Sequence, residues 1–178
     1  MATENPKSKS KENPMRDVLI AKVTLNIGVG KSDDMMKKGL KLLSKLSNVK
    51  PVKTSTSKRI PGFGLRPGLA IGCKTTIRRG AEELLRKLLV AKEGILLEKC
   101  FDKQGSFSFG IAEYIDIPGL EYDPDLKIMG LEVAVTLERK GFRIKRRKIS
   151  PNKIGIKHKI TKEEAMQFIT DKFGVTVE

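Results

Sequence analysis

The sequence contains few of the residue types on which metal sites and many active sites depend. Among its 178 residues there is no tryptophan, a single histidine, His158, and two cysteines, Cys73 and Cys100. Two cysteines and one histidine do not complete a four-ligand zinc site without carboxylates. One histidine inside a cationic run is weak support for a Ser-His-Asp or Cys-His catalytic site. We therefore expect no metal, no cofactor and no enzymatic activity, and we expect both cysteines to be buried apolar thiols.

Long apolar runs are also missing. No stretch approaches the roughly 20 apolar residues that a membrane-spanning helix needs. Residues 1–14 are rich in Lys, Ser, Asn and Glu and have no apolar centre, so they do not resemble a signal peptide. We expect this segment to be a disordered basic tail and the protein to be cytoplasmic, where a structural disulfide is not expected. Residues 15–178 have the length of a single domain.

Acidic residues are absent from two long stretches, although the whole chain contains 21 of them. Residues 35–81 carry twelve Lys and Arg, and residues 139–160 carry ten. Between them, residues 82–138 hold twelve acids and six bases. This segregation of a net charge of +15 indicates a surface directed at the phosphates of a nucleic acid. An anionic membrane surface and a solvated basic face without a partner are the alternatives.

Hydropathy patterns predict an α+β fold. Apolar and polar residues alternate over residues 18–29, where Val23, Leu25 and Ile27 fall on one face of a strand. Further strands are expected at residues 51–56, 69–77, 107–111 and 131–138, and helices at residues 33–46, 80–91 and 162–173. Ser32 is expected to cap the first helix, and Thr161 with Glu164 the last. Because strands and helices alternate irregularly, we expect a mixed, mainly antiparallel sheet covered by helices on one face.

The two strands that flank residues 58–68 predict a long protruding hairpin loop. The loop is rich in Pro and Gly. Phe63 at its tip is expected to be either a platform on which a base stacks or part of a small local core. In the basic C-terminal extension, Phe142, Ile144 and Ile149 lie among Lys and Arg. This segment is expected either to extend the edge of the sheet or to lie on RNA.

One segment resembles a nucleotide-binding loop. Gly28-Val29-Gly30-Lys31-Ser32 follows a predicted strand and precedes a predicted helix, as in a P-loop. A P-loop also needs a glycine five residues before Gly30, and that position is Leu25, an inward residue of the strand. A P-loop nucleotide hydrolase is therefore only the weaker alternative function. Paired catalytic carboxylates are not expected either, because solvated turn carboxylates explain Glu121, Asp123 and Asp125.

An ordered series of short motifs resembles one known family. The series runs through residues 13–16 (NPMR), 22–30 (KVTLNIGVG), 50–52 (KPV), 58–66 (KRIPGFGLR), 71–72 (IG), 75–80 (TTIRRG), 101–111, 122–131 and 139–166. It is similar to the universal large-subunit ribosomal protein five family. The basic ending from residue 139 onward resembles the archaeal and eukaryotic branch of that family.

The resemblance implies a structural RNA-binding protein of the large ribosomal subunit. The family binds 5S rRNA and helps to seat it in the central protuberance, beside 23S rRNA and neighbouring 5S-associated ribosomal proteins. It also contacts the P-site tRNA and, across an intersubunit bridge, a small-subunit protein. We accordingly expect a monomer within the ribosome that has no membrane partner.

The resemblance also implies which residues contact RNA. The 5S rRNA contacts map to Asn26, Gly28, Lys53, Thr54, Ser55 and Thr56. The tRNA contacts map to the hairpin loop: Lys58, Arg59, Gly62, Phe63, Gly64 and Arg66. The two acid-free stretches add six candidates for rRNA binding: Lys74, Arg78, Arg79, Arg143, Arg146 and Arg147. Polar side chains on a strand offer hydrogen-bond donors to phosphates and 2′-hydroxyls, and a glycine there lets RNA approach the backbone.

Overall fold

The computed structural model describes residues 13–30 and 32–178, so residues 1–12 of the predicted tail lie outside it, as does Lys31. The described chain begins with a 3-10 turn, Pro14–Arg16. There the side chain of Asn13 accepts a hydrogen bond from the backbone N–H of Met15 at 3.0 Å. Among the described residues, no helix is both long and apolar enough to cross a membrane.

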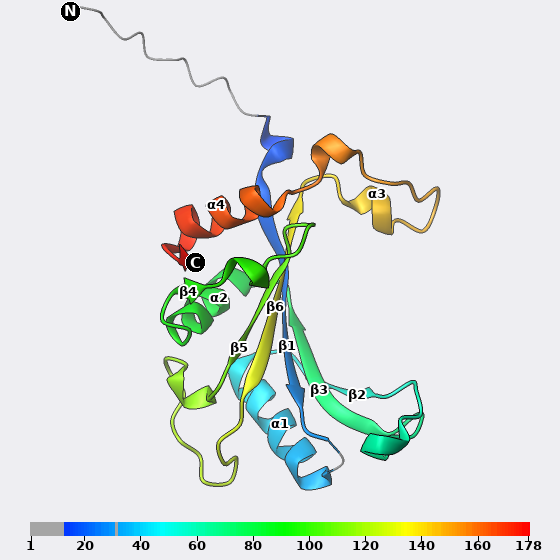
Figure 1. The fold of residues 1–178 in the computed structure, drawn as a ribbon, viewed down its shortest axis with the longest axis vertical. Helices are drawn as coiled ribbons and strands as arrows, with labels where there is room; N and C mark the ends of the chain where they lie inside the picture. Colours follow the sequence, from blue (N-terminus) through cyan, green and yellow to red (C-terminus); the bar gives the residue numbers. More distant parts are fainter. Residues whose placement is uncertain (1–12, 31) are drawn as a thin grey trace, which may run out of the picture.

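A five-stranded antiparallel sheet forms the centre of the fold (Figure 1). Its strands, in spatial order, are β2 (Val52–Ser55), β3 (Ala70–Ile77), β1 (Val18–Gly28), β6 (Leu131–Arg139) and β5 (Phe107–Ile111). Two short parallel strands, β4 (Ile95–Leu96) and β7 (Thr176–Val177), form a separate sheet. The predicted α+β class and mainly antiparallel pairing are confirmed, and the parallel pairing lies outside the main sheet.

Four helices accompany the strands in the described part of the chain: α1 (Asp33–Leu46), α2 (Ala81–Val90), α3 (Arg143–Arg146) and α4 (Lys162–Phe173). The predicted capping residues stand at the helix starts. The hydroxyl of Ser32 accepts a hydrogen bond from Met35 N–H at 3.4 Å, and Thr161 and Glu164 form a reciprocal capping box. α4 ends where Gly174 adopts a left-handed conformation with a φ of 68°.

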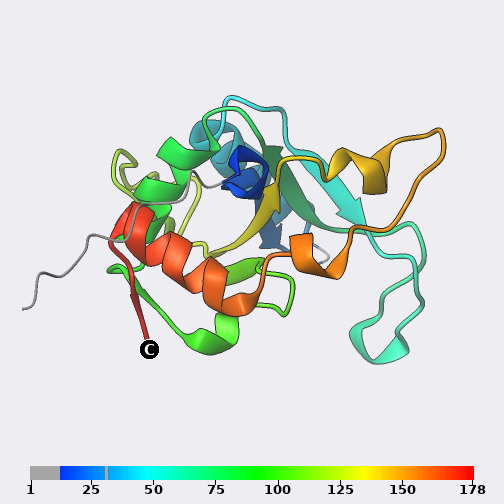
Figure 2. The same cartoon turned by 90° about the horizontal axis from the view of Figure 1, so that it is seen from above.

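The two faces of the sheet differ because successive side chains of a strand point to opposite sides. Val23, Leu25 and Ile27 of β1 are buried on the face that α1, α2 and α4 cover (Figures 1 and 2). Burial of each such side chain contributes about 1.5–3 kcal/mol to stability. The side chains on the opposite face are exposed or half-buried. One face of β1 therefore forms the core, and the other is available for contacts.

Two segments project from this domain, to the right of the sheet in Figures 1 and 2. The first is the hairpin loop between β2 and β3. Its base is closed by backbone hydrogen bonds of 2.9 Å from Thr56 to Leu69 and from Gly68 to Thr56. The second is the C-terminal extension between β6 and α4, which contains α3 and a 3-10 turn, Ile156–His158. The alternative that the extension continues the edge of the sheet is wrong, because none of the five strands comes from the extension.

The two cysteines are free thiols. Cys73 on β3 is fully buried, and this burial raises the pKa of its thiol. Cys100 is only partly buried, so the prediction of two buried cysteines is confirmed for Cys73 alone. A Cβ added at Gly39 of α1 would lie 2.9 Å from the Cys73 sulfur, which shows how closely α1 packs against β3.

Gly28 and Gly72 form a cross-strand pair that provides a matched test of the packing between β1 and β3. A Cβ at Gly72 would lie 2.8 Å from the backbone oxygen of Ile27 and 2.9 Å from Oγ1 of Thr54, whereas a Cβ at Gly28 would meet nothing within 4 Å. Gly72→Ala should lower the free energy of unfolding by about 1–3 kcal/mol through overpacking, and Gly28→Ala should change it little. Urea unfolding measures both variants, and equal stabilities would contradict this register.

Candidate nucleic-acid interface

The uncovered face of the sheet presents mostly short polar side chains. Along β1 it carries Thr24, Asn26 and Gly28. On β3, Thr24 pairs with Thr76, Asn26 with Lys74 and Gly28 with Gly72. On β6, Thr24 pairs with Ala134 and Asn26 with Glu132. Because few of these side chains are long, a sugar-phosphate backbone can approach the strands closely.

Charged groups on this face are few, and the two lysines are matched by two acids, Glu132 and Glu138. Glu138 forms an ion pair with Arg146. Glu132 accepts a hydrogen bond from the side-chain amide of Asn26 at 3.0 Å, so this acid is engaged within the sheet. Lys74 is exposed on the other side of Asn26, and Lys22 pairs with Thr136 farther along the face. The face can therefore offer two ammonium groups to phosphates.

The predicted contact residues of β2 do not share one side of the sheet. Thr54 pairs with Gly72 and so lies on the uncovered face. Lys53 pairs with Cys73, whose side chain is buried on the helix-covered face, so Lys53 points away from the predicted contact surface. The register shifts between Thr54 and Ser55, where β2 ends. The structure brings Thr54 to the β1 face and separates Lys53 from it.

The hairpin loop has an ordered backbone. At its base, the hydroxyl of Thr56 accepts a hydrogen bond from Lys58 N–H at 3.3 Å and donates one to the Lys58 carbonyl at 2.9 Å. Near the tip, Ile60 and Leu65 exchange backbone hydrogen bonds of 3.1 and 3.0 Å. Gly64 turns the chain with a φ of 59°, a conformation that favours glycine.

The loop presents its side chains to solvent. Phe63 at the tip is 73% exposed, so the alternative of a small local core is wrong. The other candidates for tRNA contact are exposed as well: Lys58, Arg59, Gly62, Gly64 and Arg66. The tip therefore combines an open aromatic ring with three cations, which suits contact with a nucleic acid.

Arg78 and Arg79 are exposed directly after the end of β3. Arg79 lines a hollow between the end of α1 and the start of α2, together with Lys45 and Glu83. This hollow belongs to the helix-covered side of the molecule. The structure therefore does not bring Arg79 to the sheet face that carries Asn26.

The three arginine candidates of the extension are all exposed, but two of them make contacts within the protein. Arg146 forms an ion pair with Glu138 at the end of β6, so part of its charge is neutralised. The Nε of Arg147 donates a hydrogen bond to the carbonyl of Ser150 at 2.7 Å. Arg143 begins α3.

Arg139 ties the base of the extension to α4. Its side chain is only 7% exposed, and its guanidinium donates a hydrogen bond to Glu164 at 2.9 Å. Burial opposes ionisation of Glu164, but the backbone N–H of Thr161 and the Arg139 guanidinium together lower its pKa. The single histidine, His158, lies with its Nε2 2.9 Å from the Lys140 carbonyl. His158 therefore supports the base of the extension.

The segment that resembles a P-loop does not have the geometry of one. β1 continues to Gly28, and the N–H groups of Val29 and Gly30 both donate to the carbonyl of Ile71 at 3.0 Å. In a P-loop such N–H groups point at phosphates. Because β3 already uses them here, the backbone does not form a phosphate cradle. The described residues also contain no group of three metal-ligating side chains.

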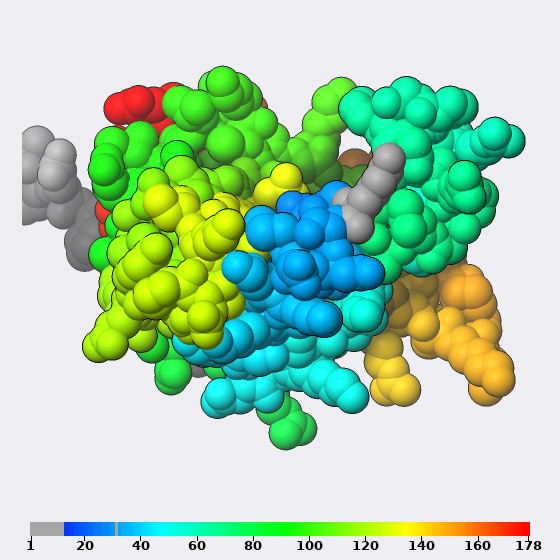
Figure 3. All heavy atoms as spheres, turned by 90° about the horizontal axis from the view of Figure 1, so that it is seen from below, coloured from blue at the N-terminus to red at the C-terminus, as the bar shows by residue number. Residues whose placement is uncertain are grey.

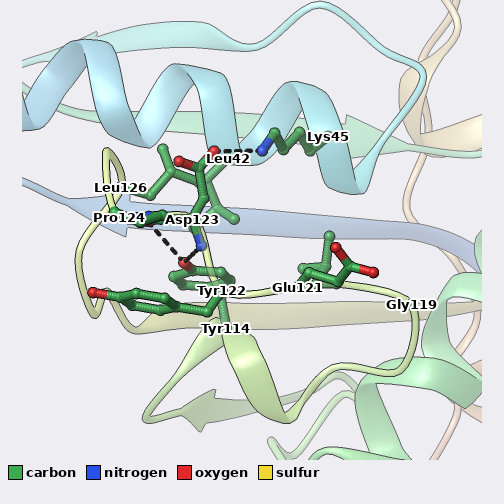
Figure 4. A pocket seen from close by; sticks show the side chains of 10 residues that line it. Leu42, Lys45, Tyr114, Gly119, Glu121, Tyr122, Asp123, Pro124 and Leu126 are labelled. Atoms are coloured by element: carbon green, nitrogen blue, oxygen red, sulfur yellow. Dashed lines mark hydrogen bonds and ion pairs between the residues drawn. The ribbon is translucent and has the colours of Figure 1, made fainter.

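The acidic loop between β5 and β6 is clamped onto α1, which the sequence did not reveal. In Figure 4, Asp123 lies between Lys45 of α1 and the hydroxyl of Tyr114. Its carboxylate is 2.6 Å from Nζ of Lys45 and 3.2 Å from Nζ of Lys41. Its backbone N–H donates to the Tyr114 hydroxyl at 3.0 Å. The Asp123 side chain is only 17% exposed, so our prediction of a solvated carboxylate is wrong for Asp123, although Asp125 is 84% exposed.

This clamp holds a loop with exposed acidic and apolar side chains beside α1. In Figure 3 the loop lies next to α1, and the hairpin loop lies on the other side of the view. Two large apolar side chains are exposed on the acidic loop, Tyr122 at 57% and Ile128 at 61%. The exposed acids Glu121 and Asp125 lie close to them in the sequence. The hollow between this loop and α1 is also lined by Lys37, Lys38, Lys41 and Lys127, so the surface combines charges of both signs with exposed apolar area.

Comparison with known proteins first identifies the class, that of ribosomal proteins. A family model described as ribosomal protein L5 matches residues 13–66. A second model, which describes the C-terminus of the same ribosomal family, matches residues 70–168. Together the two models span nearly the whole described part of the chain.

Similar full-length proteins then identify the family. Large ribosomal subunit protein uL5 of Sulfolobus acidocaldarius is 47% identical over 94% of both chains. The protein of the same name from Nanoarchaeum equitans is 45% identical over 93% of this chain and 99% of its own, and that from Archaeoglobus fulgidus is 44% identical over 99% of both. This chain therefore belongs to the ribosomal protein L5 (uL5) family, in its archaeal-type branch. It is a structural protein of the large ribosomal subunit and not an enzyme.

The clamp at Asp123 predicts a specific dependence of stability on pH. The hydrogen bond from Lys45 is the main cause that lowers the pKa of Asp123 to about 2. A carboxyl with a depressed folded-state pKa stabilises the fold above its unfolded pKa of about 3.9, and this stabilisation is lost as the pH falls toward about 2. Asp123→Asn should therefore be less stable than the parent at about pH 6, and the difference should shrink below about pH 4.

Urea unfolding across this pH range measures the difference. Asp125→Asn is the matched control, because Asp125 is 84% exposed and should contribute little. An Asp123→Asn difference that stays constant down to about pH 2 would show that the ion pairs do not stabilise the fold.

Proposed function

We propose that this protein binds 5S rRNA and helps to attach it to 23S rRNA in the central protuberance of the large subunit. The observation that carries the proposal is the uncovered sheet face around Asn26, Gly28, Thr54 and Lys74. This face belongs to the same domain as two exposed basic segments, the hairpin loop and the extension. Membership of a ribosomal protein family supports rRNA as the polyanion for this surface.

The geometry favours recognition of the RNA backbone over recognition of bases by the sheet. Short hydroxyl and amide side chains can donate to phosphates and 2′-hydroxyls, and Gly28 leaves open space above the strand. The sheet face carries no exposed aromatic side chain among the described residues, and single-strand binders depend on such stacking platforms. We therefore expect the sheet to bind a structured part of the RNA through its shape.

The hairpin loop is the proposed contact with P-site tRNA. It projects from the domain (Figure 1), and its tip exposes Phe63 beside the cations Lys58, Arg59 and Arg66. An exposed ring and guanidinium groups can pack on bases and pair with phosphates. Because the tip projects beyond the ends of β2 and β3, it can contact a second RNA while the sheet face binds 5S rRNA.

The acidic loop at Asp123 is the proposed surface for protein partners. Its exposed Glu121, Tyr122, Asp125 and Ile128 combine negative charge with apolar area. Basic ribosomal proteins, including a small-subunit protein across an intersubunit bridge, have the complementary charge. In this arrangement the protein enters the ribosome as a monomer whose RNA-facing and protein-facing surfaces are distinct.

Binding to the cognate 5S rRNA at several salt concentrations tests the main proposal. Filter binding should show submicromolar affinity that falls steeply with salt, and weaker binding to random RNA. Lys74→Ala should reduce the affinity and lower the slope of log affinity against log salt by about one. Lys92→Ala is the control, because Lys92 is exposed in the acidic middle of the chain, just beyond α2. Equal binding of 5S and random RNA would overturn the 5S assignment.

Replacement of Lys58, Arg59 and Arg66 by Ala tests the division between sheet and hairpin. Because these side chains are exposed, the triple variant should fold normally. It should retain 5S rRNA binding and weaken tRNA retention at the P site by about tenfold, since three cationic contacts are lost. Tryptic or urea stability of the variant serves as the folding control. Loss of both activities to the same extent would show that the two surfaces are not separate.

A further inference from the structure

A hollow with apolar walls and a basic rim lies on the C-terminal extension. It is lined by Arg143, Ile144, Arg147, Lys148, Ile149 and Ser150. Ile144 and Ile149 supply the apolar area, and the cations Arg143, Arg147 and Lys148 surround it. The extension that carries the hollow and the hairpin loop lie at opposite ends of the sheet (Figure 1).

The exposure of the two isoleucines needs an explanation. Ile149 is 83% exposed and Ile144 is 42% exposed. Single exposed aliphatic side chains are common on protein surfaces, but these two share one hollow in a projecting segment. None of the residues of α3 is buried, so the extension has little core of its own. A partner that covers the hollow would remove this apolar area from water.

The backbone around the hollow is held in place before any partner binds. The N–H of Arg147 donates to the Arg143 carbonyl at 2.9 Å, and the N–H of Asn152 donates to the Ile144 carbonyl at 3.2 Å. The Nε of Arg147 then spans the turn to the Ser150 carbonyl at 2.7 Å. A segment ordered in this way loses less conformational entropy on binding than a flexible one does.

The charge around the hollow selects an anionic occupant. No acid occurs between Arg139 and Ile160, and the nearest preceding acid, Glu138, is paired with Arg146. Phosphates can therefore approach Arg143, Lys148 and the rim without repulsion from a nearby carboxylate. A group that covers the apolar walls while its phosphates contact the basic rim must be weakly polar and attached to those phosphates. A nucleobase meets both conditions.

We propose that this hollow binds an unpaired nucleotide of rRNA. Its nucleobase lies against Ile144 and Ile149, and the flanking phosphates lie against the surrounding Arg and Lys side chains. The bases of a regular A-form duplex are stacked and their faces are covered, whereas bulged or looped nucleotides expose theirs. The proposal rests on the RNA binding argued above and adds a second, local recognition site to it. It gives the extension a preference for RNA that contains an extruded base.

Two RNA hairpins test the proposal with the full-length protein. They are identical except that one carries a single bulged 2-aminopurine, which is fully paired within the stem of the other. Fluorescence anisotropy should show about fivefold tighter binding of the bulged hairpin, consistent with partial burial of an isoleucine side chain. The emission of the bulged 2-aminopurine should change on binding.

Two isoleucine variants locate the effect. Ile149→Ser should abolish the preference for the bulge and leave the salt dependence of binding unchanged. Ile156→Ser is the matched control, because Ile156 is also in the extension and is 86% exposed but does not line the hollow. It should retain the full preference. Both side chains are exposed, so both variants should fold normally.

The outcomes separate this inference from the proposed function. Equal affinity of the parent protein for both hairpins would overturn the nucleotide site and leave RNA binding intact. An equal loss of preference in the two isoleucine variants would also overturn it, because the hollow would then have no special role. Failure to bind either hairpin or 5S rRNA would overturn the proposed function itself.

Discussion

The two-residue alternation along β1 is the constraint on which the rest of the structure depends. β1 lies between β3 and β6, so its register is fixed on both sides. A slip by one residue would expose Leu25 and Ile27 and would bury Asn26, which would cost several kcal/mol. The register that forms the core therefore also sets the position of the polar face. For this reason, the proposed RNA contacts on β1 are as rigid as the core beneath them.

Ion pairing inside the protein redistributes the charge that the sequence suggests. In the first acid-free stretch, Lys41 and Lys45 neutralise Asp123. In the second, Arg139 is buried against Glu164, and Arg146 pairs with Glu138. These pairs reduce the positive charge beside α1 and at the base of the extension. The other cations of these stretches include Lys58, Arg59 and Arg66 in the hairpin, Lys74 on the sheet face, and Arg143 and Lys148 at the hollow beside Ile149.

The elements that could be predicted from the sequence are those whose signals are local. The alternation at Val23 and Leu25 and the capping pair Thr161 and Glu164 act within a few residues, and both were predicted correctly. The features that were missed depend on distant contacts. Asp123 meets Lys45 across 78 positions of the chain, and the orientation of Lys53 follows from its pairing with Cys73 on another strand. The order of the motifs does not show which face of a strand a residue occupies. For this reason, the motifs assigned Lys53 to the contact surface although it points to the other side.

The two projecting segments illustrate how a small domain can reach beyond its own core. Ordering a residue costs about 1–2 kcal/mol of conformational entropy, and neither segment has enough buried surface to offset that cost along its whole length. Each is instead fixed by a few contacts, at Thr56 and Gly64 in the hairpin and at Arg139 and Arg147 in the extension. Because these contacts use only a few side chains, most other side chains of the two segments stay exposed to a partner. The same arrangement explains why exposed apolar residues occur at Phe63 and Ile149. Where a segment has no core of its own, its apolar side chains leave water only when a partner, here the proposed RNA, covers them.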